Sequence, residues 1–576
     1  MQGLLARWGF RAAEPSAPLS MRERILHARG LTDPETLHAF LEPKLTQLHD
    51  PSLIPDLDRA AARILEALHL SEPIVIFGDY DVDGVTGTAI LWHMLRALHP
   101  GAHVSTYVPH RLDEGYGLNI EAVRELAAAG ARLIVTVDCG ITAHEPANVL
   151  RELGIDLIIT DHHHPPAHVD DLPNAYAVVH PRRPDSKYPF GDLSGAGVAY
   201  KLAWRLATLH ASNHKVDPRI RELLVDLLAF AALGSIADIV PLLGENRVIA
   251  RHGLVRCKHT RFIGLRALVE ASDLAGENID AMGVGFRLGP RLNAAGRMGH
   301  AREANELFTT DDPARAAEIA AHLSRQNQER QQVERAIFET ASARAIELGM
   351  TTPERRAIVL AHADWHAGVV GIVCSRLVEK HHRPVILMNI KDGICHGSGR
   401  SIEGFDLHAG LTHCAQHIDR FGGHTMAAGL HLAEPKLHAF TSAFLDYAAS
   451  AIPAGSMGRR ITIDTEAKLA ELTPESVAAL ATLEPCGAGN PSPMLLLRGL
   501  SIADTPQPMG AQAKHLAIHL RDDRLRVRAV AWNFGPYRDR LAAGQRIDVV
   551  VRPKLSTWNG AARVEPEIVD LHLANV

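Results

Sequence analysis

The sequence has few cysteines, and no two of them stand at metal-binding spacing. Six cysteines are spread over 576 residues without a C-x-x-C motif. A zinc ribbon and a dense disulfide framework are therefore both excluded. This usage predicts reduced thiols and a cytoplasmic protein. Residues 1–30 contain no continuous apolar segment, so we expect no signal peptide there.

An excess of positive charge is also missing. The formal net charge is −6, with 34 histidines counted as neutral. This balance is unlike that of a strongly basic nucleic-acid-binding protein, so any such binding must depend on local patches or metal ions. The composition, 46% hydrophobic and 22% charged, is that of a globular protein with more than one core.

Long apolar segments are absent as well. The longest, 223–243, is interrupted by Asp226 and Asp238. It therefore predicts a buried helix followed by a loop, and we expect no membrane span.

From about residue 55, apolar strands alternate with helical segments. We expect strands at 74–77, 103–108, 133–137, 157–160 and 175–179, and helices at 57–69, 84–98, 120–129 and 142–153. This alternation predicts an α/β fold in which a parallel sheet carries helices on both faces. Helices dominate from 197 to about 260.

The later part of the chain changes pattern twice. Residues 313–348 contain no glycine and no proline after Pro313, which predicts one long connecting helix. A second α/β unit begins near 356, with strands at 357–360 and 385–388 around a helix at 369–379. From 461 onward, short strands and one helix near 474–481 predict a small OB-type β-barrel.

These patterns divide the chain into five predicted regions. They are an N-terminal helical cap (1–50), a catalytic parallel-sheet domain (51–300), a connector helix (301–350), a second α/β domain that binds substrate (351–452) and the OB-type barrel (456–576).

Three carboxylates alternate directly after the first predicted strand. Asp79, Asp81 and Asp83 follow the apolar segment 74–77. Alternate residues of an extended chain point to one side, and open α/β sheets bind ligands at this edge. Carboxylates this close repel one another, and a divalent cation relieves the repulsion. A solvated acidic turn is the alternative.

Other acidic and imidazole residues follow the neighbouring strands. Asp138 follows 133–137, Asp161-His162-His163 follows 157–160, and Asp238 lies in a Gly-Ser-Ile-Ala-Asp motif. Strand ends of a parallel sheet meet along one edge, so these groups could form a site for two Mn²⁺ or Mg²⁺ ions with one bridging carboxylate. Two such ions activate water and stabilise the leaving oxygen in phosphodiester hydrolysis. A helix cap at Asp238 and satisfied polar roles for the histidines are the alternatives, but four acidic strand ends favour metal.

These motifs closely resemble those of the DHH phosphoesterases, and within them the RecJ family of single-stranded-DNA-specific 5′→3′ exonucleases. The likeness runs from about residue 70 to the C-terminus. It includes the motifs at 78–84, 137–140, 161–163, 234–242, 289–297, 365–372, 397–401 and 421–424. The resemblance implies a DHH domain in 51–300 and a DHH-associated domain in 351–452.

The resemblance also implies a set of metal ligands: Asp81 and Asp83 for the two ions, Asp138 as the bridge, and His162 and Asp238 for the second ion. Asp79 would complete or support the first ion, and His163 would face the scissile phosphate. Several DHH phosphatases have a ligand histidine where this sequence has Phe77, so the role of Asp79 stays open.

A second implied site binds the 5′-terminal phosphate. Gly397-Ser398-Gly399-Arg400 offers backbone N–H groups, a hydroxyl and a guanidinium within four residues. A plain tight turn is the alternative. The resemblance places Ser398 and Arg400 around the phosphate, together with Arg111. It implies further nucleic-acid contacts at Arg291, Asn293 and Arg297 in a Gly-flanked loop, and at His366, Gly399, Gly423 and His424.

Aromatic and basic residues are interleaved in the predicted barrel. Trp532 and Trp558 could stack on the bases of a single strand while nearby arginines follow its phosphates. Acidic residues nearly match the basic ones, and Trp532 alternates like a core residue, so both orientations stay open. Cys486 is interpreted as structural, because no base stands beside it in the sequence.

The resulting prediction is a metal-dependent enzyme that degrades single-stranded DNA from the 5′ end to mononucleotides, in repair and recombination. The resemblance implies a single-strand DNA-binding protein and a RecQ-type helicase as partners, and a monomer associated with the nucleoid. One alternative is a DHH-family phosphatase of short oligonucleotides or cyclic dinucleotides, which leaves the connector and barrel unexplained. The other is a non-catalytic DNA-binding scaffold, which predicts lost ligands, whereas every ligand position is filled.

Overall fold

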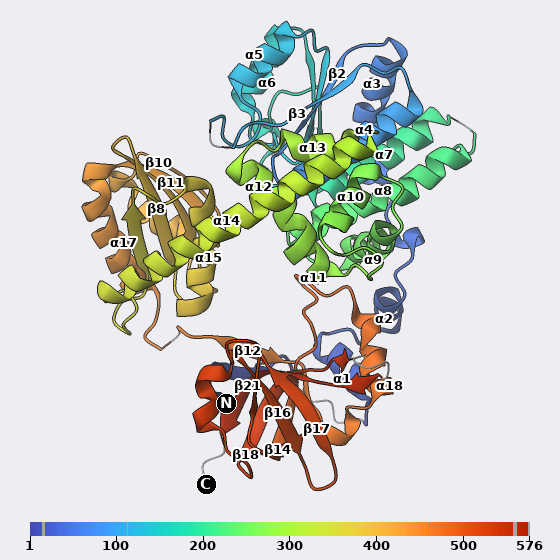
Figure 1. Cartoon of the computed structure of the whole chain (residues 1–576). Helices are drawn as coiled ribbons and strands as arrows, with labels where there is room; N and C mark the ends of the chain where they lie inside the picture. Colours follow the sequence, from blue (N-terminus) through green and yellow to red (C-terminus); the bar gives the residue numbers. More distant parts are fainter. Residues whose placement is uncertain (14–17, 112, 213, 456, 557–561, 574–576) are drawn as a thin grey trace. The chain divides into compact units, whose positions relative to one another are not determined.

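A computed structural model describes residues 1–13, 18–111, 113–212, 214–455, 457–556 and 562–573. The chain forms two compact units, whose elements are labelled in Figure 1. The first contains Ala39–Gln331 and Pro485–Pro491, and the second contains Met1–His38, Gln332–Glu484 and Ser492–Val576. The predicted long helix is α14 (Pro313–Glu347), which has residues in both units.

The first unit is built on a five-stranded sheet in the order β3-β2-β4-β5-β6. All neighbouring strands in it are parallel. Its strands are β2 (Ile74–Gly78), β3 (Val104–Tyr107), β4 (Leu133–Val137), β5 (Asp156–Thr160) and β6 (Ala177–Val179). Each overlaps a predicted strand, so the predicted parallel sheet is confirmed.

Helices cover both faces of this sheet because its strand residues alternate between two cores. Ile76 belongs to one core, and Phe77, the next residue, belongs to the other. The first core includes residues of α3 (Leu57–His69), α4 (Val82–Leu98), α7 (Gly195–His210) and α8 (Pro218–Ala237); the second includes residues of α5 (Ile120–Ala128) and α6 (His144–Glu152).

More helices complete the first unit: α9 (Gly244–Lys258), α10 (Ile263–Ala271), α11 (Ala281–Gly283), α12 (Gly289–Met298) and α13 (Arg302–Thr309). The Gly-flanked loop predicted at 289–297 is wrong, because this segment is the helix α12. Pro290 lies in its first turn, where a helix has no use for the missing N–H. Among the described helices, none combines the length and the apolar character needed to cross a membrane.

The second unit contains a mixed five-stranded sheet in the order β10-β11-β9-β8-β7. Its strands are β7 (Ile358–His362), β8 (Val385–Lys391), β9 (Ile394–Arg400), β10 (Arg420–Gly423) and β11 (Ala427–Ala433), with helices α15 (Ala367–His381), α16 (Leu407–His413) and α17 (Leu437–Ala451). The turn considered at 397–400 is wrong. These residues lie inside β9, which pairs with β8 on one side and β11 on the other.

The C-terminal strands form the predicted OB-type barrel. β14 (Leu495–Ile502), β18 (Arg546–Arg552), β21 (Glu567–Leu573), β17 (Arg526–Ala531) and β16 (His515–Arg521) follow one another in the sheet, and pairing of β14 with β16 closes it. The helix predicted near 474–481 is α18 (Pro474–Ala479), extended by one 3₁₀ turn.

The N-terminal region is not a purely helical cap. It contains α1 (Met21–Ala28) and α2 (Pro34–Leu41), but it begins with β1 (Arg7–Phe10), which pairs in parallel with β12 (Arg460–Ile463). The buried carboxylate of Asp570 fixes this segment by accepting hydrogen bonds from the backbone N–H of Ala6 and the indole of Trp8, at 2.9 and 2.8 Å. The strand forms because its partner β12, although far away in the sequence, is adjacent in the fold.

Candidate metal centre

Three aspartates follow directly after neighbouring strands of the parallel sheet. Asp79 follows β2, Asp138 follows β4 and Asp161 follows β5. The backbone N–H of Asp79 donates to the carbonyl of Val137, and that of Asp138 donates to the carbonyl of Thr160. Pairing therefore continues past the strands and holds the three carboxylates at the carboxyl edge of the sheet, where such folds bind ligands.

Asp81 and Asp83 are held by helix N-termini. Asp81 is the N-cap of α4, and its Oδ1 accepts from the N–H of Asp83 and Gly84 at 2.9 and 3.1 Å. Asp81 therefore caps a helix, but this role uses only one of its carboxylate oxygens. Asp83 accepts from Gly195 N and Ala196 N at 2.6 and 2.9 Å, at the start of α7.

Position 195 requires glycine because the side chain of Asp138 lies too close to leave room for a Cβ atom. A Cβ added there would lie 2.6 Å from the Cβ of Asp138. Asp138 itself adopts φ of +64°, a conformation that costs free energy for any residue with a side chain. The turn after β4 and the first residue of α7 are therefore fitted to one another around this carboxylate.

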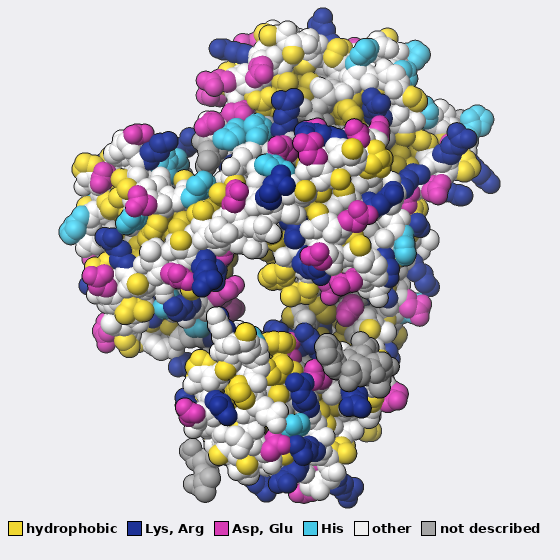
Figure 2. All heavy atoms as spheres, viewed as in Figure 1, with side chains coloured by type: hydrophobic (Ala, Val, Ile, Leu, Met, Phe, Trp, Pro, Cys, Tyr) yellow, Lys and Arg dark blue, Asp and Glu magenta, His cyan; other side chains and the backbone are white. Residues whose placement is uncertain are grey.

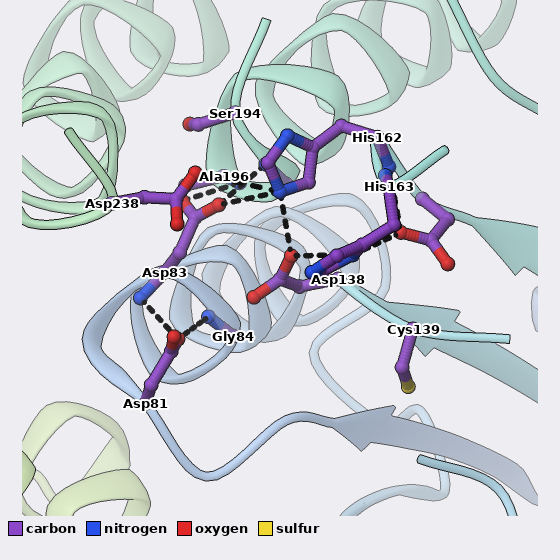
Figure 3. A network of polar contacts seen from close by, with 12 residues as sticks. Asp81, Asp83, Gly84, Asp138, Cys139, His162, His163, Ser194, Ala196 and Asp238 are labelled. Carbon is purple, nitrogen blue, oxygen red and sulfur yellow. Dashed lines mark hydrogen bonds and ion pairs between the residues drawn. The ribbon is translucent and has the colours of Figure 1, made fainter. Parts of the chain in front are cut away.

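The imidazole of His162 lies at the centre of the carboxylates, as Figure 3 shows. Its Nε2 is 3.1 Å from Asp138 Oδ1, 3.5 Å from Asp238 Oδ2 and 3.7 Å from Asp83 Oδ2. Asp238 is the C-cap residue of α8, as the helix-cap alternative allowed, and its carboxylate lies at the site. Burial, together with the charge of His163, lowers the pKa of His162 to about 3 and keeps its ring neutral.

The potential ligand atoms fall into three overlapping groups, each within 4.8 Å: Asp79, Asp81 and Asp138; Asp83, His162 and Asp238; and Asp138, His162 and His163. Sequence reasoning predicted all seven of these residues for the site, and the fold brings them together. Asp138 and His162 each belong to two of the groups, and of these two Asp138 is the carboxylate, whose two oxygens suit a bridging ligand.

Unsatisfied atoms support a metal at this place. Asp79 Oδ1, Asp138 Oδ1 and His162 Nε2 are buried and have no hydrogen-bond partner within the described chain. Buried polar atoms without partners cost free energy, so a protein that keeps three of them together needs a ligand for them. Carboxylate oxygens with one or two imidazoles are donors that suit Mn²⁺ and Mg²⁺.

Burial and crowding raise the pKa of four carboxyl groups in this cluster. Burial, with the charge of Asp81, raises the pKa of Asp83 to about 7. Burial, with the charges of Asp83 and Asp81, raises the pKa of Asp238 to about 8. Burial and neighbouring carboxylates also push the pKa of Asp79 and Asp138 well above the usual range. A divalent cation would stabilise the ionised forms that this site otherwise disfavours.

Asp161 has a different role, which the sequence did not reveal. Its carboxylate accepts from the backbone N–H of Ile141, His162 and His163, and from Nδ1 of His163 at 2.8 Å. Burial alone would lower the pKa of His163, but this hydrogen bond and the charge of Asp161 raise it to about 9. Asp161 therefore orients His163 and keeps it protonated. Its place directly before the two histidines was the available signal.

Tyr116 is a second residue that sequence reasoning missed. Its hydroxyl donates to the backbone carbonyl of Asp138 at 3.0 Å and lies 3.1 Å from Nδ1 of His163. Its ring also lies edge-on to Tyr80. The guanidinium of Arg111 lies over the Tyr80 ring, 4.6 Å from its centre, so Arg111 is close to the metal residues. No motif precedes Tyr116 that would have indicated this contact.

Ser398 and Arg400 lie together in the second unit. Both side chains approach Gly371 of α15: a Cβ added there would be 3.3 Å from Ser398 Oγ and 3.4 Å from Arg400 Nη2. Because β9 is paired on both sides, its backbone N–H groups are used by the sheet, and only the side chains can bind phosphate. Arg111 belongs to the first unit, so a pocket shared by all three stays a prediction.

The remaining predicted contacts differ in their surroundings. Arg291 donates to Ser324 Oγ and to the carbonyl of Arg287, so it is engaged within the helical layer. The Nδ1 atom of His366 caps α15 by accepting from Gly368 N. Gly399 is buried, and a Cβ there would meet Leu407. The exposed residues are Gly423, which ends β10, and His424, which follows it, while Asn293 and Arg297 lie on α12.

In the barrel, Trp532 is 47% exposed and lies edge-on to His515, so it is not a core residue. Trp558 lies outside the described residues. Arg526 and Arg528 pair with Asp504 and Glu565. On the face drawn in Figure 2, basic and acidic side chains are mixed, without a broad field of one sign.

Known families match along most of the chain. The DHH family N-terminal domain matches residues 73–232, the DHHA1 domain matches residues 354–450, and the RecJ OB domain matches residues 463–570. The chain is 36% identical to the single-stranded-DNA-specific exonuclease RecJ of Bacillus subtilis (strain 168), over 98% of this chain and 70% of that protein.

Two crystal structures of RecJ from Thermus thermophilus share the fold. The complex with Mn²⁺ gives a TM-score of 0.81 at 34% identity, over 99% of this chain and 80% of that chain. The complex with Mg²⁺ gives a TM-score of 0.75 at 32% identity, over 99% and 79%. These are the cations that the sequence predicts for the acidic cluster. The matched domains and the identity along nearly the whole sequence lead to one conclusion: this chain belongs to the RecJ family of single-stranded-DNA-specific exonucleases, within the DHH phosphoesterases.

Proposed function

We propose that this chain removes mononucleotides from single-stranded DNA in the 5′→3′ direction, with two Mn²⁺ or Mg²⁺ ions bound at the sheet edge. The observation that carries this proposal is the cluster of seven potential ligand residues, of which Asp79, Asp83, Asp138 and His162 are buried and three have an unsatisfied atom among the described contacts. A catalytic role explains why a fold would hold these groups at such a cost in free energy.

The ligands divide between two positions. Asp79 and Asp81 would hold the first ion, Asp83, His162 and Asp238 would hold the second, and Asp138 would be shared between them. When bound, the ions supply positive charge to the phosphodiester and lower the pKa of a water molecule. His163, kept protonated by Asp161, donates a hydrogen bond to the scissile phosphate. Tyr116 limits the movement of the His163 ring.

The direction of degradation follows from the 5′-terminal phosphate. We infer that Ser398, Arg400 and Arg111 bind it, because a hydroxyl and two guanidinium groups can surround a dianion with charge-assisted hydrogen bonds. The phosphate would then fix the distance from the 5′ end to the cleaved bond. Asn293, Arg297, Gly423, His424 and Trp532 would contact the rest of the strand.

The cellular setting belongs to the same proposal. A nuclease for single strands needs an activity that separates duplex DNA, so we infer a RecQ-type helicase and a single-strand DNA-binding protein as partners in repair and recombination. We further infer that the enzyme acts as a monomer in the nucleoid region of the cytoplasm. The OB-type barrel, a fold used to hold single strands, supports this setting.

Digestion of long oligonucleotides tests the function. With Mn²⁺, a 5′-phosphorylated single strand labelled at its 3′ end should shorten progressively to mononucleotides, while the matching blunt duplex should persist. Blocking the 5′ end should stop digestion, and blocking the 3′ end should not. Activity confined to oligomers of a few nucleotides would instead favour a phosphatase of short products.

A further inference from the structure

An apolar groove lies directly beside the metal residues of the first unit. It has a volume of about 250 Å³, and residues on both sides of Asp238, Ala237 and Ile239, line it. Other lining residues are Met282, Phe286, Pro290 and Asn293. One wall of the groove is therefore formed by the same segment that carries Asp238, a predicted metal ligand.

The groove is bordered by exposed apolar side chains. Ile239 is 73% exposed, Phe286 71% and Met282 61%. Ile239 and Phe286 are the two most exposed large hydrophobic side chains among the described residues. Single exposed apolar residues are common on protein surfaces, but several around one groove indicate a binding surface.

Ile239 is held in a strained conformation. Its φ of +61° lies in the left-handed region, which a β-branched residue adopts only at a cost in free energy. Helices commonly end with glycine or asparagine at such a position. Stability therefore does not explain an isoleucine here, directly after Asp238. An outlier of this kind points to a function for the side chain.

Phe286 is placed by an irregular helix. Val284–Leu288 forms a π-helical turn between α11 and α12. Val284 and Leu288 are fully buried, while Phe286 projects into solvent. A π-helical turn is less stable than a continuous α-helix, and such turns are frequent at functional sites.

A segment from the distant part of the chain closes one side. The carbonyl of Ala488 accepts from Leu242 N at 2.8 Å, and Gly487 lies so close to Leu242 that a Cβ would be 2.7 Å from its side chain. Cys486 lines the groove from this segment. This wall of the groove is thus fixed by hydrogen bonding and packing.

The chemistry of the lining identifies the ligand. No charged side chain is among the described lining residues, and Asn293 contributes their one side-chain amide. The groove therefore suits a flat, largely apolar group that needs few hydrogen bonds. A nucleobase has these properties, and a phosphodiester at the metal residues would bring the adjoining base to this place.

We propose that this groove binds the nucleobase next to the scissile phosphate, with Phe286 and Ile239 against its faces. Binding is independent of base identity, because every base has a face that can stack on an aromatic ring. The groove thereby positions the phosphodiester for cleavage. This role rests on the proposed exonuclease function and specifies how the substrate is held.

Removal of single bases tests the groove. Two 5′-phosphorylated single strands are compared with Mn²⁺, one undamaged and one with an abasic nucleotide at a defined internal position. The full-length enzyme should pause at the abasic position. Phe286→Ala should digest the undamaged strand more slowly, by roughly tenfold for the loss of one stacked base. The same variant should lose most of the pause, because the contact that the missing base would make is already absent.

Matched variants separate this role from folding and metal binding. Val255→Ala removes a side chain that is 62% exposed on α9 and does not line the groove, so it should behave like the parent. Ile239→Asn should weaken digestion while Tm stays equal or rises, because asparagine tolerates the left-handed region. For both groove variants, the shift in Tm on adding Mn²⁺ should match that of the parent.

The two levels of the hypothesis fail in different ways. If the parent digests undamaged DNA but passes abasic positions without a pause, the groove does not bind a base, and the exonuclease function stands. The same holds if Phe286→Ala keeps the parental rates on both strands. If the parent digests neither strand, the proposed function fails, and the role of the groove fails with it.

Discussion

The Nε2 atom of His162 lies 3.1 Å from Oδ1 of Asp138, and within the described chain neither atom has a hydrogen-bond partner. Two buried acceptors this close disfavour the metal-free state unless a proton or cation lies between them. Burial lowers the pKa of this imidazole to about 3 and raises that of Asp138, so in the metal-free state a proton on Asp138 can lie between the two atoms, and a cation that displaces this proton can be bound by both. This pair is therefore the most specific sign of a metal centre in the molecule.

Asp138→Ala should abolish cleavage while largely sparing DNA binding. The substitution removes the carboxylate that belongs to two ligand groups, whereas the contacts expected to hold the strand lie elsewhere. Nuclease assays with Mn²⁺ and fluorescence anisotropy with a labelled single strand would measure the two properties. Unchanged hydrolysis would refute the bridging role. Tm in a chelator should not fall, because the change also removes buried repulsion.

Stabilisation by Mn²⁺ should grow as the pH rises. In the metal-free protein the pKa is about 7 for Asp83 and about 8 for Asp238, above the ~3.9 of an unfolded aspartate. The folded state thus binds more protons than the unfolded chain between about pH 4 and 8, so the free energy of unfolding falls as pH rises. Mn²⁺ binds the ionised carboxylates and reverses this loss.

Thermal unfolding with chelator or with Mn²⁺ measures this effect. The difference in Tm between the two conditions should be larger near pH 8 than near pH 6, because fewer protons then compete with the metal. Asp83→Asn should flatten the dependence. A difference in Tm that is constant across this range would show that these carboxylates do not bind the metal.

The strand ends of this site could be predicted because the signal is local. An apolar segment followed by aspartate occurs at Asp79, Asp138 and Asp161, and parallel pairing brings such ends together. Asp238 was counted with these strand ends, but it is the C-cap of α8, because the apolar segment before it forms a helix. The local pattern could not predict which backbone groups donate hydrogen bonds to each carboxylate. An example is the hydrogen bond from Gly195 N, at the start of α7, to Asp83.

Two segments were misjudged for the same physical reason. Glycines at 289 and 296 were interpreted as part of a loop, and a tight turn was the alternative left open for the glycines at 397 and 399. In the structure they allow close packing inside regular elements: Gly397 fits against Leu430 and Met388, and Gly296 against Tyr80. Tertiary contacts of this kind override local propensity. The strand β1 was missed because its partner lies more than 400 residues away.

Asp161→Asn should shift the pH dependence of cleavage and destabilise the fold. Asparagine offers one acceptor oxygen and no charge, so the raised pKa of His163, about 9, should fall. The alkaline limit of activity should then move to lower pH. Lost hydrogen bonds to a buried group should cost about 1–3 kcal/mol of unfolding free energy.

Asp156→Asn provides the matched control for this change. Asp156 lies at the opposite end of β5 and pairs with Arg63 at 2.7 Å. It should affect Tm without moving the pH profile. A parental pH profile in Asp161→Asn would show that His163 is not the protonated group in the reaction.

Lys201→Met should destabilise the first unit without changing the chemistry. Lys201 and Glu245 form a fully buried ion pair, and Tyr188 donates to the same carboxylate. Removing the lysine leaves a buried charge without its partner, which typically costs ~3–5 kcal/mol. Denaturant unfolding should show this loss, and activity per folded molecule at low temperature should be unchanged. Lys201→Met combined with Glu245→Leu should recover part of the stability, and a failure to recover would contradict an electrostatic cause.

Arg400→Ala should remove the preference for a 5′-phosphate over a 5′-hydroxyl. The guanidinium lies beside the Ser398 hydroxyl on one face of β9, and charge-assisted contacts of this type are worth about 1.5–3 kcal/mol, or roughly 10- to 150-fold in rate ratio. Initial rates on two oligonucleotides that differ only at the 5′ end measure the ratio. Arg400→Lys should give an intermediate value, because it keeps the charge and loses the two-pronged geometry. Arg420→Ala, which changes an exposed arginine on β10 of the same sheet, should keep the parental ratio. If Arg400→Ala keeps the parental rate ratio and Arg420→Ala lowers it, the role of Arg400 is refuted. The 5′-phosphate would then bind near the edge strand β10.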